Sequence, residues 1–157
     1  LPMSAFSPGP AGQAPLRVGP YRVAPFICYE IVYGNLVARN ARKTDLLVTI
    51  SNDTWFGDSI GPLQHLQIAQ MRGRENGRYV VRATNNGVSA IIDHQGRIVA
   101  RTERFVQQTL VGEAEVMLGE TPFGSFGTAP IIVACFTVLV LMALMYVGFW
   151  REEDRST

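Results

Sequence analysis

Residues 23–30 read Val23-Ala24-Pro25-Phe26-Ile27-Cys28-Tyr29-Glu30, an apolar run that ends in a cysteine. The run favours a buried strand, and the residues that follow it favour a helix. A cysteine on a sharp strand-to-helix turn is exposed, and the positive end of the helix stabilises its thiolate, so this arrangement can present a nucleophile. Position alone leaves a second interpretation open, in which Cys28 is a buried structural thiol.

The rest of the first 118 residues alternates between strand and helix patterns. Apolar residues recur at helical spacing over residues 31–42, and Pro62 opens a second helix that Gly77 closes. Strands are predicted at residues 21–28, 45–51, 79–84, 88–93, 98–102 and 108–116. The first two strands are nearly continuous apolar runs, typical of strands covered on both faces. This order indicates an α/β layered sandwich; residues 1–20 are interpreted as an irregular loop.

Polar and aromatic side chains follow two of these strands at their carboxyl ends. They are Asn52, Asp53, Trp55, Phe56 and Asn85. Because α/β sheets place their ligand sites at this edge, we predict that these residues bind substrate beside Cys28, with the two aromatics forming a lip for an apolar chain. Two other interpretations stay open: the aromatics cap the core, and residues 85–87 form an ordinary tight turn.

A thiol nucleophile needs a base, and the sequence offers few candidates. Both histidines, His65 on the helix after Pro62 and His94 in a hairpin turn, are predicted to be solvated surface residues. Lys43 is the single lysine, and we predict that it lies at the opposite edge of the sheet. Glu30 can support the site but is poorly placed as a base. The catalytic machinery on these 157 residues is therefore incomplete.

The apolar run at residues 131–150 contains no charged residue and is followed by a charged cluster. As a helix it spans roughly 30 Å, the thickness of a bilayer's hydrocarbon core. We predict a transmembrane helix at 130–150, after a linker at 119–129 and before a cytoplasmic tail at 151–157; a buried core helix is the alternative. Since the chain opens with Leu1 and a loop rich in Pro and Gly, we interpret it as the C-terminal piece of a longer protein.

Composition excludes some classes of function. The formal net charge of +1 gives no electrostatic footprint for nucleic acid. The two cysteines, Cys28 and Cys135, do not make a disulfide framework, and Cys135 falls inside the apolar run.

Several motifs together resemble the nitrilase superfamily and, within it, the bacterial apolipoprotein N-acyltransferase family. They are Phe26-Ile27-Cys28-Tyr29-Glu30, Ser51-Asn52-Asp53-Thr54-Trp55-Phe56-Gly57, Gln64-His65 through Arg72, and Arg82-Ala83-Thr84-Asn85-Asn86-Gly87-Val88-Ser89. The resemblance implies an αββα sandwich, of which residues 1–118 are the C-terminal half. It also implies a Glu–Lys–Cys triad with Cys28 as nucleophile, the Tyr29 backbone N–H as oxyanion donor, and Glu30 as a supporting residue. The triad's Glu and Lys have no match in this sequence.

The same resemblance implies a reaction. A fatty acyl chain passes from a membrane phospholipid to Cys28 as a thioester, and then to the α-amino group of the diacylglyceryl-cysteine at the N-terminus of an apolipoprotein. No cofactor, metal or nucleic acid is implied. The expected location is the bacterial inner membrane, as a multi-pass protein with its catalytic domain on the periplasmic side. A membrane-anchored amidase that hydrolyses a small amide, and a non-catalytic envelope scaffold, are the alternatives.

Overall fold

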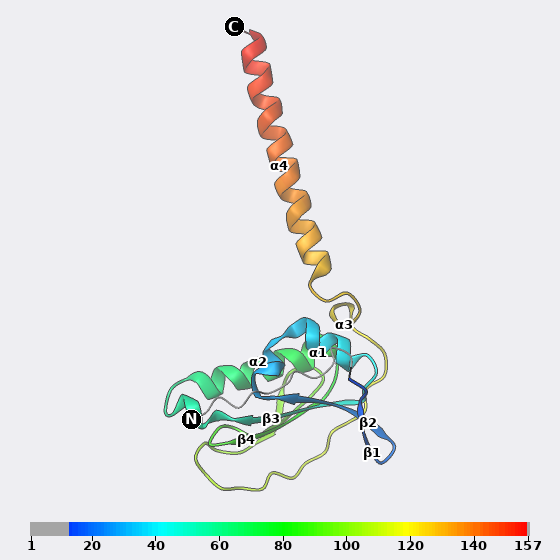
Figure 1. The fold of residues 1–157 in the computed structure, drawn as a ribbon, viewed down its shortest axis with the longest axis vertical. Coiled ribbons are helices and arrows are strands. Elements are labelled where there is room, and N and C mark those ends of the chain that lie inside the picture. The colour runs from blue at the N-terminus through cyan, green and yellow to red at the C-terminus, as the bar shows by residue number, and fades with distance from the viewer. Residues whose placement is uncertain (1–12, 157) are drawn as a thin grey trace, which may run out of the picture. The chain divides into compact units, whose positions relative to one another are not determined.

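The computed structural model describes residues 13–156, without the side chains of residues 147–156. The chain forms two compact units, Leu1–Ser125 and Phe126–Thr157. The first is built on a six-stranded sheet in the order β1-β2-β3-β4-β5-β6 (Figure 1). Its strands are β1 (Leu16–Val18), β2 (Tyr21–Ile27), β3 (Leu46–Asn52), β4 (Val80–Asn85), β5 (Ala90–Ile92) and β6 (Ile98–Arg101). β2, β3 and β4 are parallel, whereas β1, β5 and β6 pair antiparallel with their neighbours.

Helical segments follow β2 and β3, and each connects its strand to the next parallel strand across one face of the sheet. The helical elements of this unit are η1 (Cys28–Val32), α1 (Gly34–Ala41), η2 (Asp53–Phe56) and α2 (Gly61–Asn76). α2 begins with Pro62 in its first turn and ends at Gly77, whose φ of 59° is the left-handed cap that glycine adopts most readily. Figure 1 shows α1 and α2 lying together on the same face of the sheet.

The core lies between that face and the helices. Alternate strand residues point into it, so that Ala24, Leu47 and Val80 form one row across the three parallel strands. The helices and η1 contribute Ile31, Val37, Ala41, Leu66 and Ala69. Each large apolar side chain buried in this way stabilises the fold by about 1.5–3 kcal/mol.

The opposite face of the parallel strands differs from the prediction. β2 and β3 were expected to be covered on both faces, but Ile27 is 63% exposed and Ile50 is 52% exposed. The described residues place helices on one side only, so this chain forms one helix layer and one sheet of the predicted αββα sandwich. The second face is covered at β5, where the chain around Gly112 packs against it. A Cβ placed on Gly112 would lie 2.7 Å from Ile91 Cδ1, and Ile91 is buried.

Two local predictions are wrong. Residues 108–116 form no strand, because a strand needs a neighbour for its hydrogen-bond ladder and no strand of the sheet pairs with this segment. Within the predicted loop at 1–20, Leu16–Val18 pairs with β2 as a short hairpin around Gly19. Residues 1–12 of that loop lie outside the described residues.

Residues 119–124, at the end of the first unit, are hydrogen-bonded to the rest of that unit. The Arg78 guanidinium donates to Gly119 O at 2.8 Å, and Arg42 donates from Nε to Gly124 O at 2.8 Å. Gly119 and Gly124 belong to the predicted linker at 119–129, which also includes the whole of α3 (Pro122–Phe126).

The second unit is dominated by the helix α4 (Ala129–Ser156), which contains the predicted span at 130–150 and continues into the predicted tail at 151–157. Thr157 lies outside the described residues. The window Ala129–Tyr146 has a mean hydropathy of 2.4, and none of it is buried. α4 is therefore a candidate membrane span.

Candidate active site

Cys28 occupies a strained elbow between β2 and η1. Its φ is +52°, in the left-handed region that residues other than glycine rarely adopt. The turn is secured by Glu30, whose carboxylate accepts a hydrogen bond from the Ile27 backbone N–H at 2.7 Å. Backbone strain of this kind persists only where the surrounding structure enforces it, and it is common at active sites. The elbow leaves Cys28 half-buried and Tyr29 exposed.

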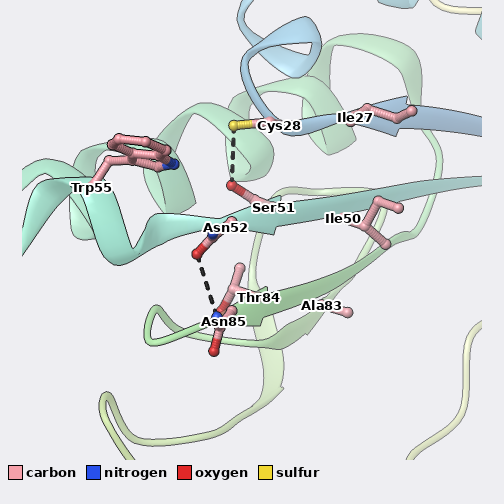
Figure 2. Close-up of a pocket in the computed structure, with 9 residues that line it drawn as sticks. All are labelled: Ile27, Cys28, Ile50, Ser51, Asn52, Trp55, Ala83, Thr84 and Asn85. Carbon is pink, nitrogen blue, oxygen red and sulfur yellow. Dashed lines mark hydrogen bonds between the residues drawn. The ribbon is translucent and has the colours of Figure 1, made fainter. Parts of the chain in front are cut away.

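Beside the elbow lies an open hollow of about 570 Å³, formed by the carboxyl ends of the three parallel strands. Its lining residues are Ile27, Cys28, Ile50, Ser51, Asn52, Trp55, Ala83, Thr84 and Asn85 (Figure 2). The structure thus brings four of the predicted site residues together, namely Cys28, Asn52, Trp55 and Asn85. Asn85 Nδ2 donates to Asn52 Oδ1 at 3.4 Å, which links the ends of β3 and β4. Trp55 stands beside Cys28 with 81% of its surface exposed.

Asp53 and Phe56 do not line the hollow. Asp53, predicted to bind substrate, is only 1% exposed, and its carboxylate is taken up by protein groups. Phe56 packs over the start of α2: its Cδ1 lies 2.5 Å from where a Cβ on Gly61 would be, and its ring centroid lies 6.5 Å from that of His65. η2 is a single helical turn that directs Trp55 outward and Asp53 into the protein, while Phe56, 37% exposed, lies against the start of α2.

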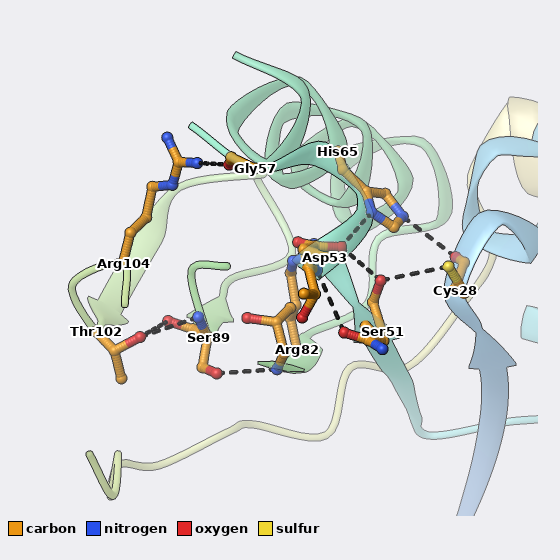
Figure 3. A network of polar contacts seen from close by, with 12 residues as sticks. Cys28, Ser51, Asp53, Gly57, His65, Arg82, Ser89, Thr102 and Arg104 are labelled. Carbon is orange, nitrogen blue, oxygen red and sulfur yellow. Dashed lines mark hydrogen bonds and ion pairs between the residues drawn. The ribbon is translucent and has the colours of Figure 1, made fainter. Parts of the chain in front are cut away.

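Behind the elbow, Asp53 is the centre of a buried polar network (Figure 3). Its Oδ2 accepts a hydrogen bond from Arg82 Nη2 at 2.7 Å, and its Oδ1 accepts one from Ser51 Oγ at 2.6 Å. Ser51 Oγ also lies 3.5 Å from Cys28 Sγ. Gly87 passes so close that a Cβ there would lie 2.2 Å from Asp53 Oδ2. The tight turn at 85–87 therefore needs glycine to make room for the carboxylate.

His65 belongs to this network, so the prediction that it is a solvated surface residue is wrong. It is 4% exposed, with Nδ1 at 3.2 Å from Asp53 Oδ1 and Nε2 at 3.2 Å from the Cys28 backbone oxygen. A signal was available in the sequence. His65 is three residues after Pro62 and four before Ala69, and all three face the sheet.

Arg82 is a functional candidate that the sequence interpretation missed. It is the largest fully buried side chain in the described part of the chain, and it sits in the middle of β4. Burial lowers the pKa of its guanidinium, whereas the neighbouring charge of Asp53 and, to a smaller extent, the Cys28 site raise it. A charged residue inside an apolar strand was the signal, because such a residue is almost never buried without a partner.

The described residues leave the hollow without a base of its own. No lysine, histidine or carboxylate is among the residues that line it. Lys43 is exposed, as predicted, and follows α1 at the amino end of β3. Within residues 13–156 no group of three or more His, Cys, Asp or Glu side chains could hold a metal ion.

Residues 4–122 match the family model described as carbon-nitrogen hydrolase. The chain belongs to the carbon-nitrogen hydrolase family. Solved structures agree at the level of the fold. The carbon-nitrogen hydrolase from Helicobacter pylori G27 superposes with a TM-score of 0.56 at 15% identity, over 63% of this chain and 42% of that one. Saccharomyces cerevisiae Nit3, a member of the nitrilase superfamily, gives 0.54 at 24% identity over 63% and 39%.

Within the carbon-nitrogen hydrolase family, the chain is similar to proteins named apolipoprotein N-acyltransferase. The one from Pseudomonas paraeruginosa is 52% identical over 155 residues, which is 99% of this chain and 30% of the relative. The one from Azotobacter vinelandii is 56% identical over 123 residues, 78% of this chain and 24% of the relative. The chain thus spans less than a third of the length of these relatives.

Proposed function

We propose that this chain carries the nucleophile of an enzyme that acylates the N-terminus of apolipoproteins. The observation that carries the proposal is the strained elbow of Cys28, which opens into a hollow with apolar walls. Ile27, Ile50 and Ala83 give that hollow a surface suited to a fatty acyl chain. The similarity to proteins named apolipoprotein N-acyltransferase supports the same reaction.

In the first half-reaction the Cys28 thiolate attacks the ester carbonyl of a phospholipid. The carbonyl oxygen becomes an oxyanion, the ester C–O bond breaks, and the lysophospholipid leaves after its alkoxide takes up a proton. The Tyr29 backbone N–H follows the nucleophile directly, so it is the proposed oxyanion donor. The product is an acyl thioester on Cys28.

In the second half-reaction the α-amino group of a diacylglyceryl-cysteine attacks that thioester. An amide bond forms, the C–S bond breaks, and the amine nitrogen loses a proton as the Cys28 thiolate is restored. Because no base lines the hollow, we propose that the triad's glutamate and lysine come from the rest of the polypeptide. They would supply the base and a second oxyanion contact.

An amine outcompetes water at a thioester only where water is excluded and the amine is concentrated. In this proposal α4 helps to meet both conditions, because a membrane anchor holds the hollow at the lipid surface where both substrates reside. We therefore place the protein in the bacterial inner membrane, with the carbon-nitrogen hydrolase domain on its periplasmic side.

The test is to incubate the intact protein in detergent with a phospholipid labelled in its acyl chains and a diacylglyceryl-cysteine peptide. Label recovered in the peptide as an amide supports acyl transfer. Free labelled fatty acid with no peptide product would instead indicate a hydrolase. Release of ammonia from small amides, with the phospholipid untouched, would favour the amidase alternative.

Replacing Trp55 with alanine separates a role at the entrance from a role in the core. The side chain is 81% exposed, so its loss should leave the melting temperature within a few degrees of the parent, because surface changes typically fall within about 0.5 kcal/mol. If Trp55 contacts the acyl chain, transfer should fall several-fold in the assay with labelled phospholipid.

Phe56→Ala is the matched control, because the neighbouring aromatic packs on His65 and Gly61 and does not line the hollow. It should lower the melting temperature. A Trp55→Ala variant that loses melting temperature and activity together would show that Trp55 is a core residue.

The proposed topology places residues 151–157 in the cytoplasm. Ser156→Cys should therefore resist an impermeant thiol reagent added to cells with a permeabilised outer membrane. Val111→Cys is the matched control, because Val111 is 86% exposed in the carbon-nitrogen hydrolase domain and should be labelled. Labelling at Ser156→Cys and protection at Val111→Cys would show the orientation opposite to the proposed one.

A further inference from the structure

Each nitrogen of the His65 ring contacts an oxygen atom. Nδ1 faces Asp53 Oδ1 and Nε2 faces the backbone oxygen of Cys28, each at 3.2 Å. A backbone oxygen only accepts hydrogen bonds, so Nε2 must carry a proton. Asp53 is paired with the Arg82 guanidinium at 2.7 Å, and a carboxylate also only accepts hydrogen bonds. Both ring nitrogens therefore face acceptors, and a hydrogen bond at each requires an N–H on both.

The second contact acts on a peptide group that matters for catalysis. The carbonyl of Cys28 and the N–H of Tyr29 belong to the same planar, trans peptide, so they point in opposite directions. A donor that holds the carbonyl oxygen from the side of α2 therefore fixes the direction of the Tyr29 N–H, on the side away from His65. That N–H is the proposed oxyanion donor.

We propose that His65, held as an imidazolium by Asp53, is a positioning residue that aims the Tyr29 backbone N–H at the oxyanion formed on substrates of Cys28. This role rests on the proposed function only in taking Cys28 as a nucleophile toward carbonyl carbon. His65 itself touches no substrate, since it does not line the hollow.

The surroundings of His65 restrict its ring to one orientation. The ring is nearly enclosed, and Phe56 covers it edge-on at a centroid distance of 6.5 Å. The Asp53 carboxylate that orients it is itself fixed by Arg82 on one oxygen and by Ser51 on the other. Among the described residues, the charged group in contact with the ring is Asp53, which belongs to the network in Figure 3. The left-handed φ of Cys28 is a conformation that such a contact can enforce.

Two reagents for Cys28 distinguish this role from a general effect on the thiol. A p-nitrophenyl ester reacts through an oxyanion, whereas iodoacetamide alkylates by direct displacement and forms none. Both reactions consume the same thiolate, so the ratio of their rates cancels any change in its population. The rates would be measured on the intact protein, with the Cys28 peptide quantified by mass spectrometry.

In His65→Leu the ratio of acylation to alkylation should fall by about tenfold or more, because one misplaced oxyanion donor costs up to 10²–10³ in rate. His65→Gln retains an N–H donor and should recover part of the loss. His94→Leu is the matched control, because His94 contacts Tyr79 far from the hollow, and its ratio should stay at the parent value. An unchanged ratio in His65→Leu would falsify the proposal.

The unaltered protein gives a second, spectroscopic test. A long-range ¹H–¹⁵N spectrum of protein labelled in histidine should show two protonated ring nitrogens for His65, assigned by its loss in His65→Gln. One bare nitrogen would overturn the imidazolium. If the ester acylates Cys28 but no phospholipid does, the proposed function fails while the role of His65 stands. If neither acylates it, both fail.

Discussion

Cys28→Ala is expected to abolish acyl transfer by the intact protein and to remove the acyl-enzyme altogether. The elbow presents a single sulfur to the hollow, and no serine, threonine or lysine in the described part of the chain lies in an equivalent strained position. Loss of a covalent nucleophile commonly costs about 10⁶-fold in turnover. Mass spectrometry of the parent protein with phospholipid should show a fatty acyl adduct on the Cys28 peptide that hydroxylamine removes.

Cys135→Ala is the matched control, because it removes the only other cysteine of this chain from the exposed surface of α4. Its acyl adduct and turnover should equal those of the parent. An adduct found on Cys135, or full activity in Cys28→Ala, would end the assignment of Cys28 as the acyl carrier. Cys28→Ser is a useful third variant, since a hydroxyl at the same elbow would form an oxygen ester that resists neutral hydroxylamine.

Local sequence patterns were sufficient for the elements that build the sheet. The apolar runs before Cys28 and Asn52 became β2 and β3, and α2 begins and ends where Pro62 and Gly77 placed it. These signals are local, because capping and alternation act within a few residues. The convergence of Cys28, Asn52 and Asn85 also followed, since the carboxyl ends of parallel strands meet at one edge.

The errors concern partners that are distant in the sequence. Residues 108–116 have strand-like composition, but no neighbouring strand completes their ladder. Ile27 and Ile50 are suited to burial, yet composition does not say whether another layer of this chain will cover them. In each case the pattern gave the residue's preference correctly, and the tertiary surroundings decided the outcome.

The buried network was missed for a related reason. Hydropathy treats His65, Asp53 and Arg82 as surface residues, because burial of any one of them alone is unfavourable. The charges of Asp53 and Arg82 offset each other and His65 contacts Asp53, so the set can be buried although no single member can. Only the positions of three different elements, η2, α2 and β4, bring them into contact.

Asp53→Asn is expected to be among the most destabilising single substitutions in the domain. The side chains of Asp53 and Arg82 are both 0% exposed, and their ion pair measures 2.7 Å. Asparagine preserves the shape but removes the charge, which leaves the Arg82 cation buried without an anion. Breaking one side of a buried pair typically costs about 3–5 kcal/mol. The drop should appear as a lower melting temperature and as faster hydrogen exchange of the β3 and β4 amides.

Asp45→Asn is the matched control, because Asp45 pairs with Arg22 at 2.9 Å where Arg22 is half exposed. Solvent screens that pair on the Arg22 side, and asparagine keeps an oxygen that can accept from the Arg22 backbone N–H, so the melting temperature should fall much less than in Asp53→Asn. The double variant Asp53→Asn/Arg82→Met then tests the cause. Arg82 Nε and Nη1 have no hydrogen-bond partner in the described part of the chain, so the arginine depends on Asp53 for its stabilisation. If uncompensated charge is the cost, removing Arg82 as well should restore much of the lost stability. A double variant as unstable as the sum of the two single variants would show that shape, and not charge, holds the network together.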